Sequence, residues 1–348
     1  MAMKIFFQGS LQGEWMSGWQ RRESLVELGH IVSSLCQDAA MQSAHPSRWQ
    51  LLLGKPQWKA KEADAFNQLW LARLLAAAPD LAWLEWPKLI AAETLERARR
   101  QLPRCVFVGF YDDNPFGTRD QDRWQWDRFL DGLPHYDLLL VKRHSDVEPL
   151  RQRGAQGVGL FMHGYFERLF HPPETEDIHR HDVSFVGTAL DHRVAFIRRL
   201  IGQEELPLSV FGNRWERTLV YHRHRSHFAP SVLGNAYAEV LQTSRVNLGF
   251  VSSSNQDEYT MRSFEIPACR GFMLAERTPA HQALFEEGKE AEFFSSVEEC
   301  ADKARFYLDH PESRRAIAQA GYDRSIESDY SLRRRLRDVL QTLPERAA

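Results

Sequence analysis

The sequence predicts an α/β protein built from two Rossmann-like domains in series. Apolar strand-like runs alternate with helical patterns, the succession expected of parallel sheets with crossover helices. The length of 348 residues suggests two domains, each large enough for its own core. The two halves also begin alike: in residues 4–10 and in residues 183–188 an expected strand is followed by Gly and then by Ser or Thr.

The first half of the chain supplies the elements of one such domain. Spacing of Phe66, Trp70 and Leu74 is typical of a helix, while Gly29 and Gly154 are typical of helix ends. A Gly- and Ser-bearing loop follows the first strand. We predict strands at 4–8, 31–35, 81–84, 106–111, 138–142 and 157–162, and helices at 19–28, 63–77, 92–100 and 146–153.

The pattern restarts after a charged segment that carries Pro172-Pro173 and lacks periodicity. We predict strands at 183–186, 208–211, 246–250 and 271–275, and helices at 193–201, 237–243, 297–310, 311–322 and 330–342. The last helix has an apolar stripe that should pack on the body of the protein. The expected organisation is a first domain at 1–164, a linker at 165–181, a second domain at 182–328 and a C-terminal helix at 329–348.

Composition narrows the class of protein. A net charge of −3 gives no reason to expect nucleic-acid binding, which depends on neutralising phosphates. Four scattered cysteines without a Cys-x-x-Cys motif argue against a disulfide framework and fit a reducing cytosol. The chain enters a strand at once, so we expect no signal peptide, and its apolar runs are shorter than the ~20 residues of a membrane helix. A cytoplasmic protein is expected.

Residues 257–275 form the most informative stretch. Asp257 and Glu265 are eight positions apart, with Thr260, Arg262 and Ser263 between them, where a loop should enter a helix. A helix N-terminus offers unpaired N–H groups to an anion, and a guanidinium suits phosphate. A carboxylate one turn into the helix can accept hydrogen bonds from a ribose diol. The stretch predicts a pocket for a nucleotide diphosphate that carries a sugar. Because neither half contains Gly-x-Gly-x-x-Gly, a simple NAD dehydrogenase is disfavoured.

Several of these segments resemble the CgeB-like glycosyltransferases, a branch of the GT-B superfamily. The resemblance is strongest from residue 183 to about 330 and looser in the first half. It rests on the combined order of five stretches: 182–188, 211–215, 262–269, 284–290 and 307–314. The family implies two Rossmann-like domains that face each other across a cleft, with a C-terminal helix that crosses back to the first. It also implies a nucleotide-sugar donor on the second domain, an acceptor on the first, and no metal or other cofactor.

In related GT-B enzymes an acidic pair with this spacing contacts the donor. By that resemblance Asp257 would touch the sugar and Glu265 the ribose hydroxyls, although Asp where Glu is commoner leaves the sugar identity open. The alternatives are a capping carboxylate for Glu265 and a surface ion pair for Arg262. The residues expected to bind the donor are Gly187, Thr188, Arg193, Asn213, Arg214, Thr260, Arg262, Ser263 and Glu265.

The acceptor side is predicted less sharply. Asp112 and Asp113 end a strand and could accept the acceptor proton in an inverting reaction, but an Asx turn explains them equally well, and a retaining reaction needs no such base. His163 also lies at a strand end and is a candidate for reaching the acceptor; the alternative is a purely structural role. The tryptophans in or near predicted loops either fill the core or form a platform on which a sugar of the acceptor stacks. The expected acceptor-binding residues are Ser10, Gly13, Trp15 and His163, and further platform candidates are Trp19, Trp124 and Trp126.

The sequence therefore predicts a metal-independent glycosyltransferase of class EC 2.4 that uses a UDP-, GDP- or dTDP-sugar. The acceptor, whether glycan, lipid-linked, protein or small molecule, is not identified, and peripheral membrane contact stays open. One alternative is a nucleotide-sugar epimerase of similar architecture, and another is a non-catalytic nucleotide-binding protein. His222, His224 and His227 carry no matching Cys or carboxylate, so a solvated basic loop is expected there rather than a metal site.

Overall fold

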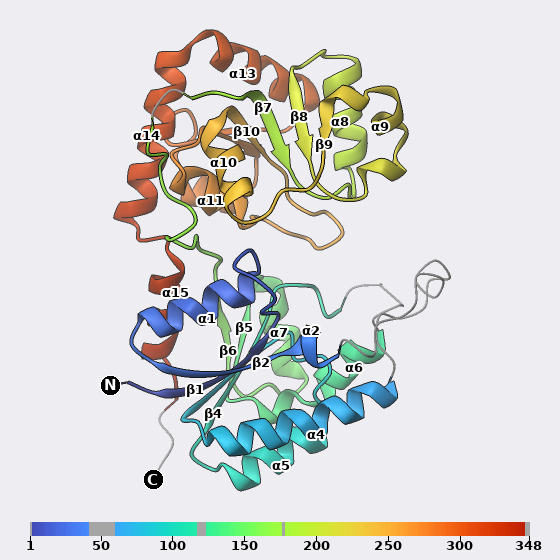
Figure 1. Ribbon diagram of the computed structural model, residues 1–348, viewed down its shortest axis with the longest axis vertical. Coiled ribbons are helices and arrows are strands. Elements are labelled where there is room, and N and C mark those ends of the chain that lie inside the picture. Colours follow the sequence, from blue (N-terminus) through green and yellow to red (C-terminus); the bar gives the residue numbers. More distant parts are fainter. Residues whose placement is uncertain (1, 42–59, 117–122, 176–177, 345–348) are drawn as a thin grey trace. The chain divides into compact units, whose positions relative to one another are not determined.

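The chain forms two compact units in the computed structural model, which describes residues 2–41, 60–116, 123–175 and 178–344. Residues 1–162 and 335–348 make the first unit, and residues 163–334 make the second. Each unit contains a six-stranded sheet, and all the strand pairs in both sheets are parallel (Figure 1). The predicted α/β fold with two Rossmann-like sheets is confirmed.

The sheet of the first unit has the order β2-β1-β3-β4-β5-β6. Its strands are β1 Lys4–Gly9, β2 Ile31–Cys36, β3 Leu81–Glu85, β4 Val106–Tyr111, β5 Leu138–Val141 and β6 Val158–Leu160. The chain leaves β1 for β2 on one side and then returns to β3 on the other. Loops that leave the carboxyl ends of β1 and β3 therefore diverge, which creates the crevice where open α/β sheets bind ligands.

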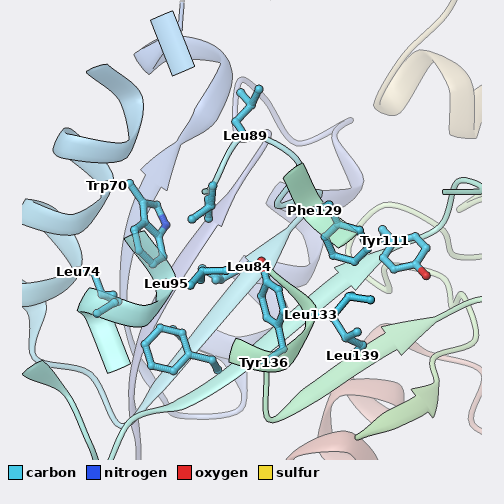
Figure 2. Packing of buried hydrophobic residues seen from close by; sticks show 14 of the residues in the cluster. Trp70, Leu74, Leu84, Leu89, Leu95, Tyr111, Phe129, Leu133, Tyr136 and Leu139 are labelled. Atoms are coloured by element: carbon cyan, nitrogen blue, oxygen red, sulfur yellow. The ribbon is translucent and has the colours of Figure 1, made fainter. Parts of the chain in front are cut away.

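Helices cover both faces of this sheet (Figure 1). They are α1 Ser17–Glu27, α2 Gln37–Ala40, α4 Ala60–Ala77, α5 Ala92–Gln101, α6 Arg123–Asp131, α7 His144–Gln152 and α15 Leu332–Gln341. Strand side chains alternate between the faces: Phe6 joins the cluster around Trp70 of α4, while Phe7 joins the cluster that holds Leu25 of α1. Figure 2 shows the first cluster, in which Trp70 and Tyr136 pack among leucines.

The C-terminal helix α15 completes the core of the first unit. Leu336 and Val339 are buried in the same cluster as Ile5 and Phe7 of β1. The spacing of three residues places both on one helix face. The expectation that this helix crosses back to the first domain is confirmed.

The second unit has the strand order β12-β11-β10-β7-β8-β9. Its strands are β7 His181–Val186, β8 Leu208–Phe211, β9 Phe228–Ala229, β10 Ser244–Gly249, β11 Met273–Glu276 and β12 Glu292–Phe294. Its α-helices are α8 Arg193–Gly202, α9 Leu219–Arg223, α10 Asn235–Thr243, α11 Arg262–Ala268, α12 Pro279–Leu284, α13 Val297–Asp309 and α14 Pro311–Glu327. From β7 the chain adds β8 and β9 on one side of the sheet and then β10, β11 and β12 on the other, so the strand order reverses between β7 and β10. A second crevice is expected at this switch point.

Several sequence expectations need correction or addition. The expected linker at 165–181 is partly ordered against the second unit, since Tyr165 forms a bridge with Ser331 and the carbonyl of His171 accepts from Gln242 at 2.7 Å. Strands β9 and β12 were not predicted. Residues 176–177 and 345–348, which belong to the predicted linker and terminal segment, lie outside the described residues. Within the described ranges, no helix is long and apolar enough to cross a membrane.

Candidate functional site

Two arginines open two helices at the switch point of the second unit. Arg193 is the first residue of α8, which follows β7, and Arg262 is the first residue of α11, which follows β10. Because β7 and β10 are neighbours in the sheet, the topology brings these two cations to the same crevice. Burial and then the positive charge of Arg262 lower the pKa of Arg193, as expected for two cations in one crevice.

Arg193 is buried and Arg262 is half-buried, and neither guanidinium has an ion partner within the described part of the chain. Arg193 is only 5% exposed, and burial, followed by the charge of Arg262, lowers its pKa to about 10. The Nε atoms of both arginines are buried without a hydrogen-bond partner. Among the described residues neither arginine side chain forms an ion pair or a hydrogen bond, and the guanidinium of Arg262 lies over the Phe185 ring at 5.9 Å from its centroid. Burying an uncompensated charge is strongly unfavourable, so the site is suited to an anion that would pair with both cations.

The nearest carboxylates are engaged in holding loops. Asp191 Oδ2 accepts a hydrogen bond from Ser252 Oγ at 2.7 Å, which ties the loop after β7 to the loop after β10. Glu276, at the end of β11, contacts His192 Nε2 at 2.5 Å and accepts from the Val251 N–H at 2.7 Å. Their negative charges act on Arg193 without direct pairing. The loops are therefore fixed while the arginines are left available to a ligand.

The predicted acidic pair flanks Arg262. Glu265 lies on α11 and is 4% exposed, and its Oε2 accepts from Tyr237 Oη at 2.7 Å. Burial raises the pKa of Glu265 to about 7, against the opposing effects of Tyr237 and Arg262. Asp257 is half-buried in the preceding loop, where its Oδ1 accepts from Asn255 Nδ2 at 3.1 Å and its N–H donates to the Ser252 carbonyl at 2.9 Å. Both carboxylates are thus positioned by specific neighbours.

Ser263 holds the first turn of α11. Its hydroxyl accepts from the Thr260 N–H at 3.1 Å and lies 2.7 Å from His281 Nε2, while His281 Nδ1 lies 2.7 Å from the Glu276 carbonyl. Burial lowers the pKa of His281, so a neutral ring that donates from Nδ1 and accepts at Nε2 fits this chain. The N–H groups of Ser263 and Phe264 are also bonded within the turn. Contrary to the sequence expectation, these helix N–H groups are not open to an anion.

The remaining predicted donor residues lie at the ends of β7 and β8. A Cβ on Gly212, whose φ is +149°, would lie 2.1 Å from the Gly187 carbonyl oxygen, so the two strand ends approach too closely for a side chain. The Gly187 carbonyl accepts from Trp215 Nε1 at 2.8 Å, and the Asn213 carbonyl accepts from the Ala189 N–H at 3.0 Å. Thr188, between these contacts, is half-buried, whereas Arg214 is exposed.

The first unit has its own cavity of about 310 Å³ at the β1/β3 switch point. Predicted residues Ser10 and Asp112 line this cavity, whereas Asp113 does not. Arg143 fixes the loop after β4 by donating to the carbonyls of Asp112 at 2.8 Å and Asp113 at 2.5 Å. The Asx turn in this loop is formed by Asn114, whose Oδ1 accepts from the Phe116 N–H at 2.9 Å.

The other predicted acceptor residues are not brought to this cavity. Trp15 is 45% exposed, and its ring lies so close to Gly13 that a Cβ there would meet it at 2.4 Å. His163 belongs to the second unit, where it is buried edge-on against Tyr259 with ring centroids 6.0 Å apart. Trp126 is in the core on α6, not in a loop, which corrects its assignment as a platform candidate.

Sequence reasoning missed a buried ion pair and an amide at the first cavity. Arg21 of α1 donates to both carboxylate oxygens of Glu85, and both side chains are almost fully buried. Gln125 lines the cavity from α6. A strand-end carboxylate was the available signal for Glu85, but the predicted strand ended one residue earlier. His227 contacts the Leu208 carbonyl, and no group of three or more metal-ligating side chains occurs in the described residues.

Comparisons with known proteins found a matching family model and several similar structures. A family model described as "Glycosyl transferase-like" matches residues 193–341, a span that contains both arginines and Glu265. Sucrose-phosphate synthase from Thermosynechococcus elongatus is similar in structure, with a TM-score of 0.68, 13% identity and coverage of 98% of this chain and 99% of that one. No curated protein sequence matches the chain.

Two further solved structures share the architecture. Anabaena HepE in complex with UDP has a TM-score of 0.60 at 13% identity, and the match covers 98% of this chain and 99% of HepE. A putative UDP-N-acetylglucosamine 2-epimerase from Listeria monocytogenes has a TM-score of 0.59 at 12% identity, covering 97% of this chain and 95% of that one. Together with the two parallel sheets, these likenesses show that the fold is GT-B.

Proposed function

We propose that this protein is a glycosyltransferase that moves a sugar from a nucleotide-diphosphate sugar to an acceptor hydroxyl without a metal ion. The observation that carries the proposal is the pair of arginines at the β7/β10 switch point, Arg193 and Arg262, whose Nε atoms are buried and which lack an ion partner in the described chain. A diphosphate supplies the negative charge that this pair lacks. The match of residues 193–341 to a glycosyl transferase-like family supports the same reading.

The donor would be oriented by the acidic pair. In this proposal Glu265 accepts hydrogen bonds from the ribose hydroxyls, and Asp257 contacts the transferred sugar. HepE, which has the same fold, was solved in complex with UDP and with UDP-glucose, which favours a uridine nucleotide as the first to test. Thr260 and Ser263 would act on the donor mainly by shaping the turn that carries Arg262.

Catalysis would come from stabilising the leaving group. When the glycosidic bond to the donor breaks, negative charge develops on the departing diphosphate. Arg193 and Arg262 are fixed before the reaction and would stabilise that charge in a site of low dielectric. Asp112, which lines the first cavity, is the proposed base for the acceptor hydroxyl if the reaction inverts configuration. Membership of the CgeB-like branch is part of this proposal.

Calorimetric titration with UDP, GDP, dTDP and ADP in the presence of EDTA tests the donor site. We expect one nucleoside diphosphate to bind the wild-type protein with a clear preference over the others and without added metal. Absence of binding by all four, or binding only after a divalent cation is added, would contradict the proposal.

An epimerase is the second candidate, because the Listeria structure, described as a putative 2-epimerase, shares the fold at nearly the same TM-score. Incubation of the protein with UDP-N-acetylglucosamine and UDP-glucose, without an acceptor, separates the two. A transferase leaves the donor sugar configuration unchanged, apart from slow hydrolysis to UDP. Appearance of a C2 epimer detected by NMR would replace the transferase proposal.

A further inference from the structure

The cavity of the first unit is lined by hydrogen-bonding groups of several kinds. Ser10 follows β1, Asp38 lies on α2, Trp86 follows β3, and Gln125 lies on α6. The volume of about 310 Å³ is at the small end of the roughly 300–1,000 Å³ range of ligand pockets. Such a space suits one or two sugar rings better than a long lipid chain or a folded peptide.

The charges at this cavity do not favour an anion. Glu85 is neutralised by Arg21, which donates to it from Nη2 at 3.0 Å and from Nε. The ammonium of Lys88 lies over the rings of Trp86 and Trp126, 4.7 Å and 4.6 Å from their centroids. Beyond these groups the lining carries two carboxylates, Asp38 and Asp112. A phosphate in this space would meet both carboxylates, and like charges at close range are unfavourable.

Gln125 is an independent sign of a ligand. Its side chain is 2% exposed, and its Nε2 is buried without a hydrogen-bond partner. A buried donor left unsatisfied costs about 1–3 kcal/mol, so a bound acceptor at this position would be favourable. Because Gln125 lines the cavity, an oxygen of a bound molecule would supply the missing acceptor.

We infer that this cavity binds an uncharged sugar ring through its hydroxyl groups. A sugar hydroxyl can donate to Asp38 or Asp112 and accept from Gln125 at the same time, which a phosphate cannot do. Trp86 adds apolar surface of the kind that packs on the C–H face of a sugar ring. We also assign this cavity as the acceptor subsite, and that assignment rests on the proposed transferase function. The binding of a sugar in the cavity does not depend on that function.

Ligand-observed NMR on the full chain tests the inference. The probes are the methyl glycosides of glucose, galactose, mannose and N-acetylglucosamine, with free glucose and glucose 6-phosphate, each measured with and without saturating UDP. We expect at least one methyl glycoside to bind, and glucose 6-phosphate to bind at least ten-fold more weakly than glucose. Binding of free glucose but of no methyl glycoside would identify a free monosaccharide as the occupant, while binding of both identifies the end of a glycan.

Two variants locate the binding. Gln125→Leu should weaken sugar binding at least ten-fold while leaving thermal stability equal or higher, because it removes an unsatisfied buried group. Asp38→Asn should weaken binding several-fold without affecting folding, since Asp38 is half-buried on a short helix. Gln152→Leu, at an exposed glutamine of α7 that bonds Glu148, is the matched control and should change nothing.

The inference is overturned if none of the sugars binds, if glucose 6-phosphate binds as tightly as glucose, or if Gln125→Leu and Gln152→Leu behave alike. Calorimetry with UDP on the same samples measures nucleotide binding separately, so a failure of the donor site can be told apart from a failure of the sugar site. Sugar binding without nucleotide binding would refute the donor site alone. Nucleotide binding without sugar binding would refute this cavity alone.

Discussion

The two units use the same kind of sheet but differ in whether the arginines at their switch points have a carboxylate partner. At the β1/β3 switch point Arg21 is paired with Glu85, and the pair is almost fully buried. At the β7/β10 switch point the buried Arg193 and the half-buried Arg262 share one crevice, and the nearby carboxylates Asp191 and Glu276 are bonded to loop groups instead. The sheet topology thus creates a crevice in each unit. Whether the arginines there have a carboxylate partner decides which class of ligand the crevice suits.

This comparison separates structural from functional charge. A buried cation with its own carboxylate is compensated within the fold, so its removal should affect stability. A buried cation without one is compensated only when a ligand is bound, so its removal should affect affinity. The following predictions test that division from the largest expected effect to the smallest.

Removing one member of the Arg21–Glu85 pair should have the largest effect. Glu85→Gln leaves the guanidinium of Arg21 buried without a counter-charge, and we expect a loss of about 3–5 kcal/mol in unfolding free energy. Urea denaturation of the full chain measures it. Glu96→Gln, which breaks the exposed Glu96–Arg100 pair, is the control and should cost less than about 1 kcal/mol. Equal losses in the two variants would refute the distinction.

Glu265 should make stability depend on pH. Its pKa is about 7 in the folded protein, raised by burial from 4.5, so between these values the folded state holds a proton that the unfolded state has lost. The unfolding free energy should therefore fall by about 3 kcal/mol as pH rises from 4.5 to above 7. Glu265→Gln should lack this component. Urea unfolding of both proteins at pH 5 and pH 8 checks it, and parallel losses would contradict the assignment.

Arg193→Met should stabilise the unliganded protein. The substitution removes a buried, unpartnered guanidinium and its repulsion with Arg262, and we expect a gain of about 1–2 kcal/mol. Thermal unfolding without nucleotide measures the change. Arg199→Met alters an arginine on the same helix that pairs with Glu298 near the surface, and it should stay within about 0.5 kcal/mol of wild type. Destabilisation by Arg193→Met would show that Arg193 is structural.

Tyr237→Phe should have the smallest effect on stability at pH 5, where Glu265 is protonated, and its main effect should be on the titration of Glu265. The hydroxyl of Tyr237 stabilises ionised Glu265 through the 2.7 Å hydrogen bond, so its loss should raise the pKa of Glu265 further. A hydrogen bond to a charged group contributes about 1.5–3 kcal/mol at most, so the midpoint should move upward by about one to two pH units. Repeating the urea series across pH 5–9 locates the midpoint. A midpoint that falls or does not move would exclude the proposed role.

The sequence predicted the sheets well, for a physical reason. Strands of a parallel sheet covered on both faces are continuous apolar runs, such as β4, which is buried at all six positions. The short strands β9 and β12 have only two and three residues, too few for such a run. Helix α6 was not predicted, because the tryptophans of this segment were interpreted as loop residues. In the structure Trp126 lies on α6 and packs in the core.

The site was only partly readable from the sequence. Asp257, Arg262 and Glu265 are close along the chain, so their spacing showed them as a group. Arg193 was one of three candidate cations, and only the pairing of β7 with β10 shows that it shares a crevice with Arg262. The Arg21–Glu85 pair joins residues of different elements, and Gln125 is notable only because it lacks a partner. Such facts depend on three-dimensional packing.

The affinity of Arg262→Gln for a nucleoside diphosphate tests the central claim most directly. Calorimetry should use whichever of UDP, GDP and dTDP binds the wild-type protein best. We expect a loss of about 30-fold or more, because a charged partner of the diphosphate is removed. Arg245→Gln, which alters an arginine of β10 that pairs with Asp182, should change the affinity less than about three-fold. Equal affinities of Arg262→Gln and the wild-type protein would contradict the account.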